Sequence, residues 1–297
     1  MKPFLFTVIS AIIFFLPSCV EDKIPDNQTS GHIKISVDES YKPIMEEQLK
    51  IFLAQNPNAI IDVEYKPEAE CFNDFLEDST RVIFVTRELN QEEKKYCESK
   101  QIVPKSLAMA RDAVCFITST ANNDLKLSIP ELKNILKGTD QRFQIVFDNQ
   151  ASSSARYIKD SLIPNESLSS NVFAAKTSEE VIQYVSENKK SIGVIGVNWV
   201  SDHSDTATQT FLEKVHIIPI KPDADSATKY VKPYQAYIGL KTYPLTRNFY
   251  FISKETWQGL GTGLVNYLCR NGQLVFKQSK LFPLRVNVFL REASANQ

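Results

Sequence analysis

His32-Ile33-Lys34-Ile35-Ser36-Val37-Asp38-Glu39-Ser40-Tyr41-Lys42-Pro43 is the stretch of sequence that decides the fold. Its first half alternates apolar and polar residues, which predicts a strand over 32–37. Its second half opens a helix in which four apolar residues recur at helical spacing: Met45, Leu49, Phe52 and Leu53. Asn56-Pro57 ends that helix. A strand that passes directly into a helix is the repeating unit of α/β folds.

The same alternation continues along the chain. Apolar runs predict further strands over 60–65, 81–86, 113–118, 143–147, 192–196 and 249–253. Helices are predicted between them over about 67–77, 128–136, 152–162 and 255–270. Three helix starts carry a polar cap followed by Glu three residues later: Asn90 with Glu93, Ser128 with Glu131, and Thr177 with Glu180. The pattern predicts mixed sheets flanked by helices.

The N-terminus carries a targeting segment that must be set aside first. After Lys2, residues 4–16 form an apolar run shorter than the roughly 20 residues that span a bilayer as a helix. Leu16-Pro17-Ser18-Cys19 resembles a lipobox. We therefore predict a signal peptide over 1–18, an acylated Cys19 that anchors the chain, and a polar tether over 20–31. The alternative is an ordinary signal peptide followed by an accidental cysteine.

Composition excludes some classes of function. The mature chain of roughly 280 residues is long enough for one large α/β unit or two lobes. Basic and acidic residues nearly cancel, 34 against 35, so nucleic acid is not an expected partner. Neither metal nor cofactor is expected, because the four remaining cysteines match no zinc spacing and only three histidines occur. Disulfide pairing stays open for these cysteines: Cys71, Cys97, Cys115 and Cys269.

Three strand-to-helix junctions carry hydroxyl groups and exposed backbone N–H groups, at 38–41, 86–88 and 150–154. Ligands of open α/β sheets bind beyond the carboxyl ends of strands, and helix N-termini favour anions. The alternative is that Ser40 and the run Ser152-Ser153-Ser154 are plain N-caps. Three consecutive serines exceed what one cap requires, so the third junction is the best candidate for an anion site.

A series of short segments covers nearly the whole mature chain in a fixed order: Glu39–Pro43, Val85–Leu89, Arg111–Val114, Leu127–Gly138, Ser191–Gly196, Tyr243–Arg247, Asn271–Gln273 and Phe282–Leu284. In this ordered set the chain resembles the PstS-like solute-binding proteins of phosphate ABC importers. The resemblance implies a two-lobed type II periplasmic binding protein fold, with a ligand cleft between lobes that close by hinge bending. Lobe I is expected over 32–115 and 246–297, and lobe II over 116–245.

The resemblance also implies the ligand-binding residues, namely Ser40, Tyr41, Arg87, Ser152, Ser153, Ser154 and Arg156. The family loop Arg-x-Asp-Gly-Ser-Gly-Thr corresponds here to 148–154, where both glycines, the Arg and the Asp are replaced. Ser152 and Ser154 keep the hydroxyl positions, and Arg87 or Arg156 would supply the guanidinium that oxyanions favour. Alternatively, Arg87 pairs with Glu88 or Glu92, and Arg156 lies on a solvated helix face.

Selectivity is expected to differ from the family pattern. Monohydrogen phosphate carries a proton that sulfate lacks, so a site distinguishes them by placing an acceptor, an aspartate in the family, against that proton. The matching strand end carries Arg87, and Gln150 replaces the loop aspartate. Glu39 and Glu70 are candidate substitutes, although both residue types are commonly solvated on helices. We therefore expect weaker discrimination against sulfate.

These observations favour one function among three. The leading hypothesis is a membrane-anchored solute-binding protein, on the periplasmic side of a bacterial envelope membrane. It captures inorganic phosphate or a related oxyanion and delivers it to ABC permease subunits. An alternative is a non-transport envelope lipoprotein, a sensor or structural partner, on the same fold. An enzyme is not expected, because no nucleophile elbow, zinc-protease motif or Walker loop occurs in the sequence.

Overall fold

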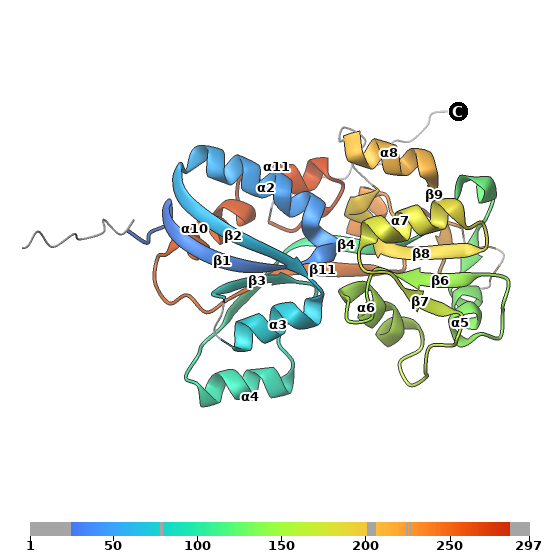
Figure 1. Cartoon of the computed structure of the whole chain (residues 1–297), viewed down its shortest axis with the longest axis horizontal. Helices are drawn as coiled ribbons and strands as arrows, with labels where there is room; N and C mark the ends of the chain where they lie inside the picture. The colour runs from blue at the N-terminus through green and yellow to red at the C-terminus, as the bar shows by residue number, and fades with distance from the viewer. Residues whose placement is uncertain are drawn as a thin grey trace, which may run out of the picture.

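The structure is a computed structural model that describes residues 25–77, 80–200, 206–223, 225, 227 and 229–285. The predicted signal peptide, Cys19 and residues 20–24 of the predicted tether lie outside the described residues. Strands and helices alternate along most of the chain and assemble into two lobes around a shared curled sheet (Figure 1).

Lobe I, as we use the term for the structure, contains both ends of the described chain. Its sheet runs in the order β2 (Asn58–Lys66), β1 (Ser30–Asp38), β3 (Val82–Val85), β11 (Thr246–Ser253) and the first part of β4 (Lys105–Ser119). β1 is parallel to both of its neighbours, whereas β11 is antiparallel to β3 and β4. The flanking helices are η2 (Glu39–Tyr41), α2 (Lys42–Gln55), α3 (Glu68–Leu76), α4 (Gln91–Ser99), α10 (Leu260–Cys269) and α11 (Gly272–Gln278).

Lobe II is built on the second part of β4, followed by β8 (Ser191–Gly196), β6 (Gln144–Phe147) and β7 (Val172–Ala174). β9 (Val215–Ile217) also pairs with this part of β4, and β5 (Leu127–Ser128) pairs with β10 (Ile220–Lys221). β12 (Phe282–Pro283) pairs with Ala110 and Arg111 in the first part of β4 and therefore belongs to lobe I. The remaining elements are η3 (Thr120–Asn122), α5 (Ile129–Lys137), α6 (Ser153–Leu162), α7 (Ser178–Glu187), η4 (Val197–Trp199), α8 (Thr206–Lys214) and α9 (Gln235–Gly239).

One long strand joins the lobes. β4 pairs with β11 through Ala113 and with β8 from Val114 onward, so a single sheet passes from one lobe into the other (Figure 1). The predicted two-lobed α/β fold is confirmed. The predicted lobe boundary after residue 115 falls inside this strand, and the boundaries themselves stay a prediction.

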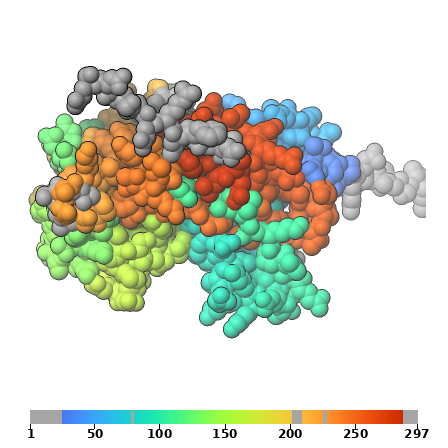
Figure 2. All heavy atoms as spheres, turned by 180° about the vertical axis from the view of Figure 1, so that it is seen from behind, coloured from blue at the N-terminus to red at the C-terminus, as the bar shows by residue number. Residues whose placement is uncertain are grey.

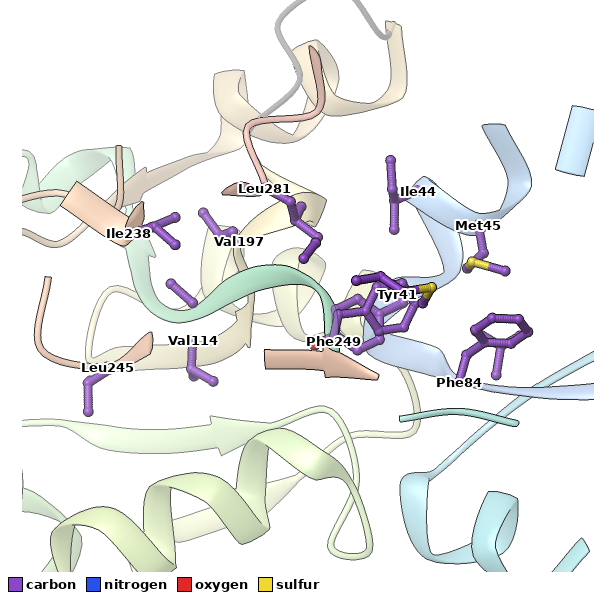
Figure 3. Packing of buried hydrophobic residues seen from close by; sticks show 14 of the residues in the cluster. Tyr41, Ile44, Met45, Phe84, Val114, Val197, Ile238, Leu245, Phe249 and Leu281 are labelled. Carbon is purple, nitrogen blue, oxygen red and sulfur yellow. The ribbon is translucent and has the colours of Figure 1, made fainter. Parts of the chain in front are cut away.

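A continuous apolar core follows the same route. Figure 3 shows Tyr41 and Phe249 packed together, with Val114, Leu245 and Val197 continuing the cluster toward lobe II. The Tyr41 and Phe249 ring centroids lie 3.8 Å apart. Burying one such side chain contributes about 1.5–3 kcal/mol. Alternate residues of a strand point to the same face, so Phe249 fixes the side of β11 that also carries Arg247.

Local sequence signals decide several helix ends. The predicted capping boxes at Asn90 and Ser128 are confirmed, and Gly138 ends α5 with a φ of 76°. The helix predicted to begin near 255 starts at Leu260, and the earlier start is wrong. Glu255 lies before the helix, where its carboxylate accepts the N–H groups of Gly261 and Thr262.

The last residues of the predicted tether contact lobe I. The Asp26 carboxylate accepts the Leu260 N–H at the start of α10 (3.0 Å) and pairs with the Arg81 guanidinium (2.5 Å). A carboxylate at this position satisfies a helix N–H that has no partner within the helix. None of the described helices is both long enough and apolar enough to cross a bilayer.

Candidate functional site

The carboxyl ends of β1 and β3 face the N-terminus of α6 across the boundary between the lobes (Figure 1). Figure 2 shows the surface hollowed between the yellow-green part of lobe II and the cyan-to-teal part of lobe I that contains α3 and α4. In an α/β sheet this is the edge at which ligands bind. The polar side chains at this edge therefore form the candidate site.

Arg247 lies at the centre of these side chains. Its Nη1 donates to Ser153 Oγ (2.8 Å), and its Nη2 donates to Ser40 Oγ (3.0 Å). The two hydroxyl oxygens are 3.2 Å apart, and the three residues are at most 5% exposed. Ser40 lies in η2, directly after β1, Ser153 starts α6 and Arg247 lies in β11, so three segments distant in sequence converge at one point.

A buried carboxylate balances this guanidinium. Arg247 Nε donates to Asp112 Oδ2 at 2.9 Å, and both side chains are almost fully buried. A buried charge is tolerated when it is paired and hydrogen-bonded. Sequence reasoning missed both residues. They lie inside two segments that carry the family resemblance, 111–114 and 243–247, but no pattern in either segment assigned them a role.

The three serines of the run Ser152-Ser153-Ser154 differ in their hydrogen bonds. Ser152 Oγ accepts the Ala155 N–H at 3.1 Å, so its side chain caps α6, as the N-cap alternative predicted. Ser153 Oγ joins Arg247. Ser154 Oγ is buried and has no hydrogen-bond partner among the described residues. Backbone N–H groups at the start of a helix lack intrahelical partners, so together with this hydroxyl the start of α6 provides the kind of donors that bind an anion.

Carboxyl groups surround this donor set. Asp38 Oδ1 accepts the Ser40 N–H (3.1 Å), and burial, with the nearby Glu68 charge, raises the pKa of Asp38 to about 7. Glu39 bridges the lobes, because its two oxygens accept the Ser178 N–H (3.2 Å) and O–H (3.0 Å) at the start of α7. Burial and the Asp148 charge raise the pKa of Glu39 to about 8.

The Glu39 pKa predicts a pH-dependent stability. A carboxyl group whose folded-state pKa is raised favours folding at low pH and loses that contribution as pH rises through its folded value, here about 8. We expect Glu39→Gln to match the parent melting temperature near pH 5 and to exceed it by a few degrees at pH 9. About 1 kcal/mol shifts the melting temperature by roughly 2–4 °C in a domain of this size.

Thermal melts at pH 5, 7 and 9 would measure this effect, with Glu179→Gln as the control, because Glu179 is an exposed residue next to Ser178 at the start of α7. An advantage of Glu39→Gln that stays the same at all three pH values would contradict the prediction.

Arg156 does not lie on a solvated helix face. Its Nε donates to Glu68 Oε2 (2.7 Å) and its Nη2 donates to Thr86 Oγ1 (2.7 Å), so it links α6 to lobe I. Glu68 Oε1 in turn accepts the Thr86 N–H (2.7 Å) and O–H (2.6 Å). Sequence reasoning named Arg156 but missed Glu68 and gave Thr86 no role of its own.

Arg87 does not contact the other predicted ligand-binding residues through its guanidinium. Its guanidinium forms a two-pronged pair with Glu93 at 2.7 and 2.8 Å and stacks 3.6 Å over the Phe72 ring. The pairing alternative was thus close to the structure, although Glu93 is the partner in place of Glu88 or Glu92. Glu70, one of the candidate acceptors, is exposed on α3. Tyr41 is buried in the core beside Ser40.

Within the described part of the chain, no group of three or more His, Cys, Asp or Glu residues is placed to hold a metal ion. The four described cysteines are free thiols, and burial raises the pKa of the Cys115 thiol above its ordinary value.

Comparison with known proteins identifies the family. Residues 24–271 match the PBP superfamily domain. The chain belongs to the PBP superfamily. Among its relatives is the phosphate-binding protein PstS of Staphylococcus haemolyticus, which is 24% identical over 76% of this chain and 71% of its own length. The predicted resemblance to PstS-like binding proteins is confirmed.

Solved structures of two other proteins share the fold. A putative phosphate ABC transporter substrate-binding protein from Clostridium perfringens, solved with bound phosphate, has a TM-score of 0.72. It is 19% identical, and the match covers 86% of this chain and all of that one. An ABC-type phosphate transport receptor from Vibrio cholerae has a TM-score of 0.62 at 15% identity, covering 85% of this chain and all of its own.

Proposed function

We propose that this protein is a lipid-anchored solute-binding protein that captures phosphate or a related oxyanion for an ABC importer. The observation that carries the proposal is the convergence of the buried Arg247 guanidinium with Ser40 and Ser153 at the start of α6. The names of its relatives, which include a phosphate-binding protein and a phosphate transport receptor, support the same ligand class.

The hydrogen-bond directions suit an oxyanion. Ser40 Oγ and Ser153 Oγ each accept an N–H from Arg247, so their own protons are directed elsewhere. One hydroxyl proton lies between the two oxygens, which are 3.2 Å apart, and the other hydroxyl would donate to a bound oxyanion. The Ser154 hydroxyl and the first-turn N–H groups of α6 add donors. Hydrogen bonds from charged or polarised donors to an oxyanion are the strong ones.

The two lobes contact each other around the site. The contacts of Glu39 with Ser178 and of Arg156 with Glu68 already link lobe I to lobe II. A ligand that contacts both lobes favours the closed arrangement only by binding it more tightly than the open one. Ser40 and Asp38 come from lobe I and the serine run from lobe II, so a bound anion would contact both.

Titration calorimetry with inorganic phosphate on the purified full-length protein tests the proposal. We expect saturable binding with a stoichiometry of one, and a rise in melting temperature as phosphate is added. Sulfate, arsenate and nitrate would define the breadth of the oxyanion class. The absence of binding to every oxyanion would reject a transport role and favour the non-transport envelope lipoprotein.

Lipid anchoring makes a separate prediction. Cys19→Ala should abolish acylation and move the protein from the membrane fraction to the aqueous fraction, because the acyl chains alone hold it at the membrane. Metabolic labelling with a fatty acid, followed by fractionation, would measure both effects, with Cys269→Ala as the control. A Cys19→Ala protein that remains wholly with the membranes would reject the lipoprotein assignment.

A further inference from the structure

The Glu68 carboxylate is held as a bound anion would be. It accepts the Thr86 N–H at the carboxyl end of β3, the Thr86 hydroxyl, and the Arg156 Nε–H, all within 2.7 Å. The Arg156 Nη2 also donates to Thr86 Oγ1, which fixes the direction of that hydroxyl proton toward Glu68. A strand-end N–H, a hydroxyl and a guanidinium are the donors that proteins use to bind oxyanions.

This donor set lies beside the first one. β1 and β3 are parallel neighbours with Val37 opposite Phe84, so Asp38 and Thr86 leave the sheet at the same edge. Across from them, Ser153 and Arg156 are three residues apart on α6 and therefore share one face of that helix. The edge of lobe I and the face of α6 thus carry two donor pairs in parallel, Ser40 with Ser153 and Thr86 with Arg156.

Electrostatics connects the two pairs. Glu68 is 2% exposed, and its charge is one of the causes that raise the pKa of Asp38. Glu68 also joins the lobes, because it belongs to α3 whereas Arg156 belongs to α6. A ligand held by Ser40 and Ser153 would therefore lie close to the negative charge of Glu68, which is bound to the second donor pair.

We propose that Thr86 and Arg156 form a second oxyanion-binding subsite, which the Glu68 carboxylate occupies as a built-in competitor. The proposal rests on the proposed function, since it concerns the same cleft. The carboxylate holds the lobes together without a ligand and keeps Arg156 from contributing to affinity. Removing Glu68 frees two hydrogen-bond donors and a guanidinium that is about one-third exposed.

Calorimetry with inorganic phosphate on the full-length protein tests this competition. We expect Glu68→Ala to bind phosphate about tenfold more tightly than the parent, which corresponds to about 1.4 kcal/mol. Glu77→Ala removes one exposed carboxylate from the end of the same helix and should leave affinity unchanged. In Glu68→Ala/Arg156→Ala the gain should disappear, because Arg156 is the group that provides it.

Three results would overturn the inference: Glu68→Ala binding no tighter than the parent, an equal gain in Glu77→Ala, or a gain that persists in the double variant. If neither the parent nor Glu68→Ala binds phosphate, the proposed function falls as well. Binding by Glu68→Ala alone would support the built-in competitor directly.

Should Glu68→Ala fail to fold, Glu68→Gln answers the same question. Its carbonyl oxygen still accepts from Thr86, but its amide faces the Arg156 guanidinium with a second donor and releases it. The same gain is expected, and its absence in a folded Glu68→Gln protein would overturn the inference.

Discussion

Replacing Arg247 with alanine is expected to abolish phosphate binding and to lower the free energy of unfolding by about 3–5 kcal/mol. The stability loss arises because Asp112 would keep a fully buried carboxylate without its partner. The binding loss arises because the guanidinium orients the hydroxyls of Ser40 and Ser153. A bound anion would lose the charge-assisted hydrogen bonds that the oriented hydroxyls donate to it, each of which contributes about 1.5–3 kcal/mol, so affinity should fall at least a hundredfold.

A second variant separates folding from binding. Arg247→Lys keeps the positive charge beside Asp112 but has no planar fork, so it should retain more stability than the alanine variant while still binding weakly. Arg142→Ala provides the control, because Arg142 pairs with Asp140 on the surface and is 61% exposed. Exposed pairs of this kind contribute about 1 kcal/mol or less.

Denaturant unfolding and phosphate calorimetry would give the two quantities. Arg247→Ala that binds phosphate like the parent would place the anion site elsewhere. A loss of stability no larger than that of Arg142→Ala would show that the Asp112 pair is not a buried ion pair in solution.

Sequence periodicity predicted the framework because local signals determine it. The strand over 32–37, the capped starts at Asn90 and Ser128, and the stop at Gly138 each depend on residues within one turn or one strand. Such signals act before any tertiary contact forms. The late start of α10 shows the limit, because Glu255 caps that helix from outside through its side chain.

The candidate site was only partly predictable, for a different physical reason. Ser40 and the serine run stand at strand and helix ends, where the residue type itself suggests an anion site. Arg247 lies two residues before the strand predicted over 249–253, and only the pairing of β11 with β4 brings it opposite Asp112. Arg87 shows a different limit, because its position after a strand suggested the site, whereas its guanidinium pairs with Glu93, six residues further along the chain in the first turn of α4.

Asp38 changes the expected selectivity. The sequence suggested weak discrimination against sulfate, because Arg87 stood where an acceptor was required. In the structure Asp38 lies next to Ser40, fully buried, and its Oδ2 has no hydrogen-bond partner within the described part of the chain. This oxygen is a better candidate acceptor for the proton of monohydrogen phosphate than Glu39, which contacts Ser178, or the exposed Glu70.

Replacing Asp38 with asparagine should therefore remove most of the discrimination between phosphate and sulfate. With its carbonyl oxygen still accepting the Ser40 N–H, the new amide group would take the place of Oδ2 and donate to an anion. Sulfate then loses a repulsion, and monohydrogen phosphate loses an acceptor. Together these changes should reduce the ratio of the two affinities by roughly tenfold to a hundredfold, since every 1.4 kcal/mol is tenfold.

The raised pKa of Asp38 adds a pH signature that a purely structural role would not produce. Below about 7 the carboxyl is protonated and donates, and above it the carboxylate accepts. Discrimination by the parent should therefore sharpen between pH 6 and pH 8, whereas Asp38→Asn should show no such change beyond that of phosphate ionisation itself. Competition binding at both pH values, with the exposed Asp62→Asn as control, would measure it. A parent and an Asp38→Asn variant that exclude sulfate equally at pH 8 would show that another group accepts the phosphate proton.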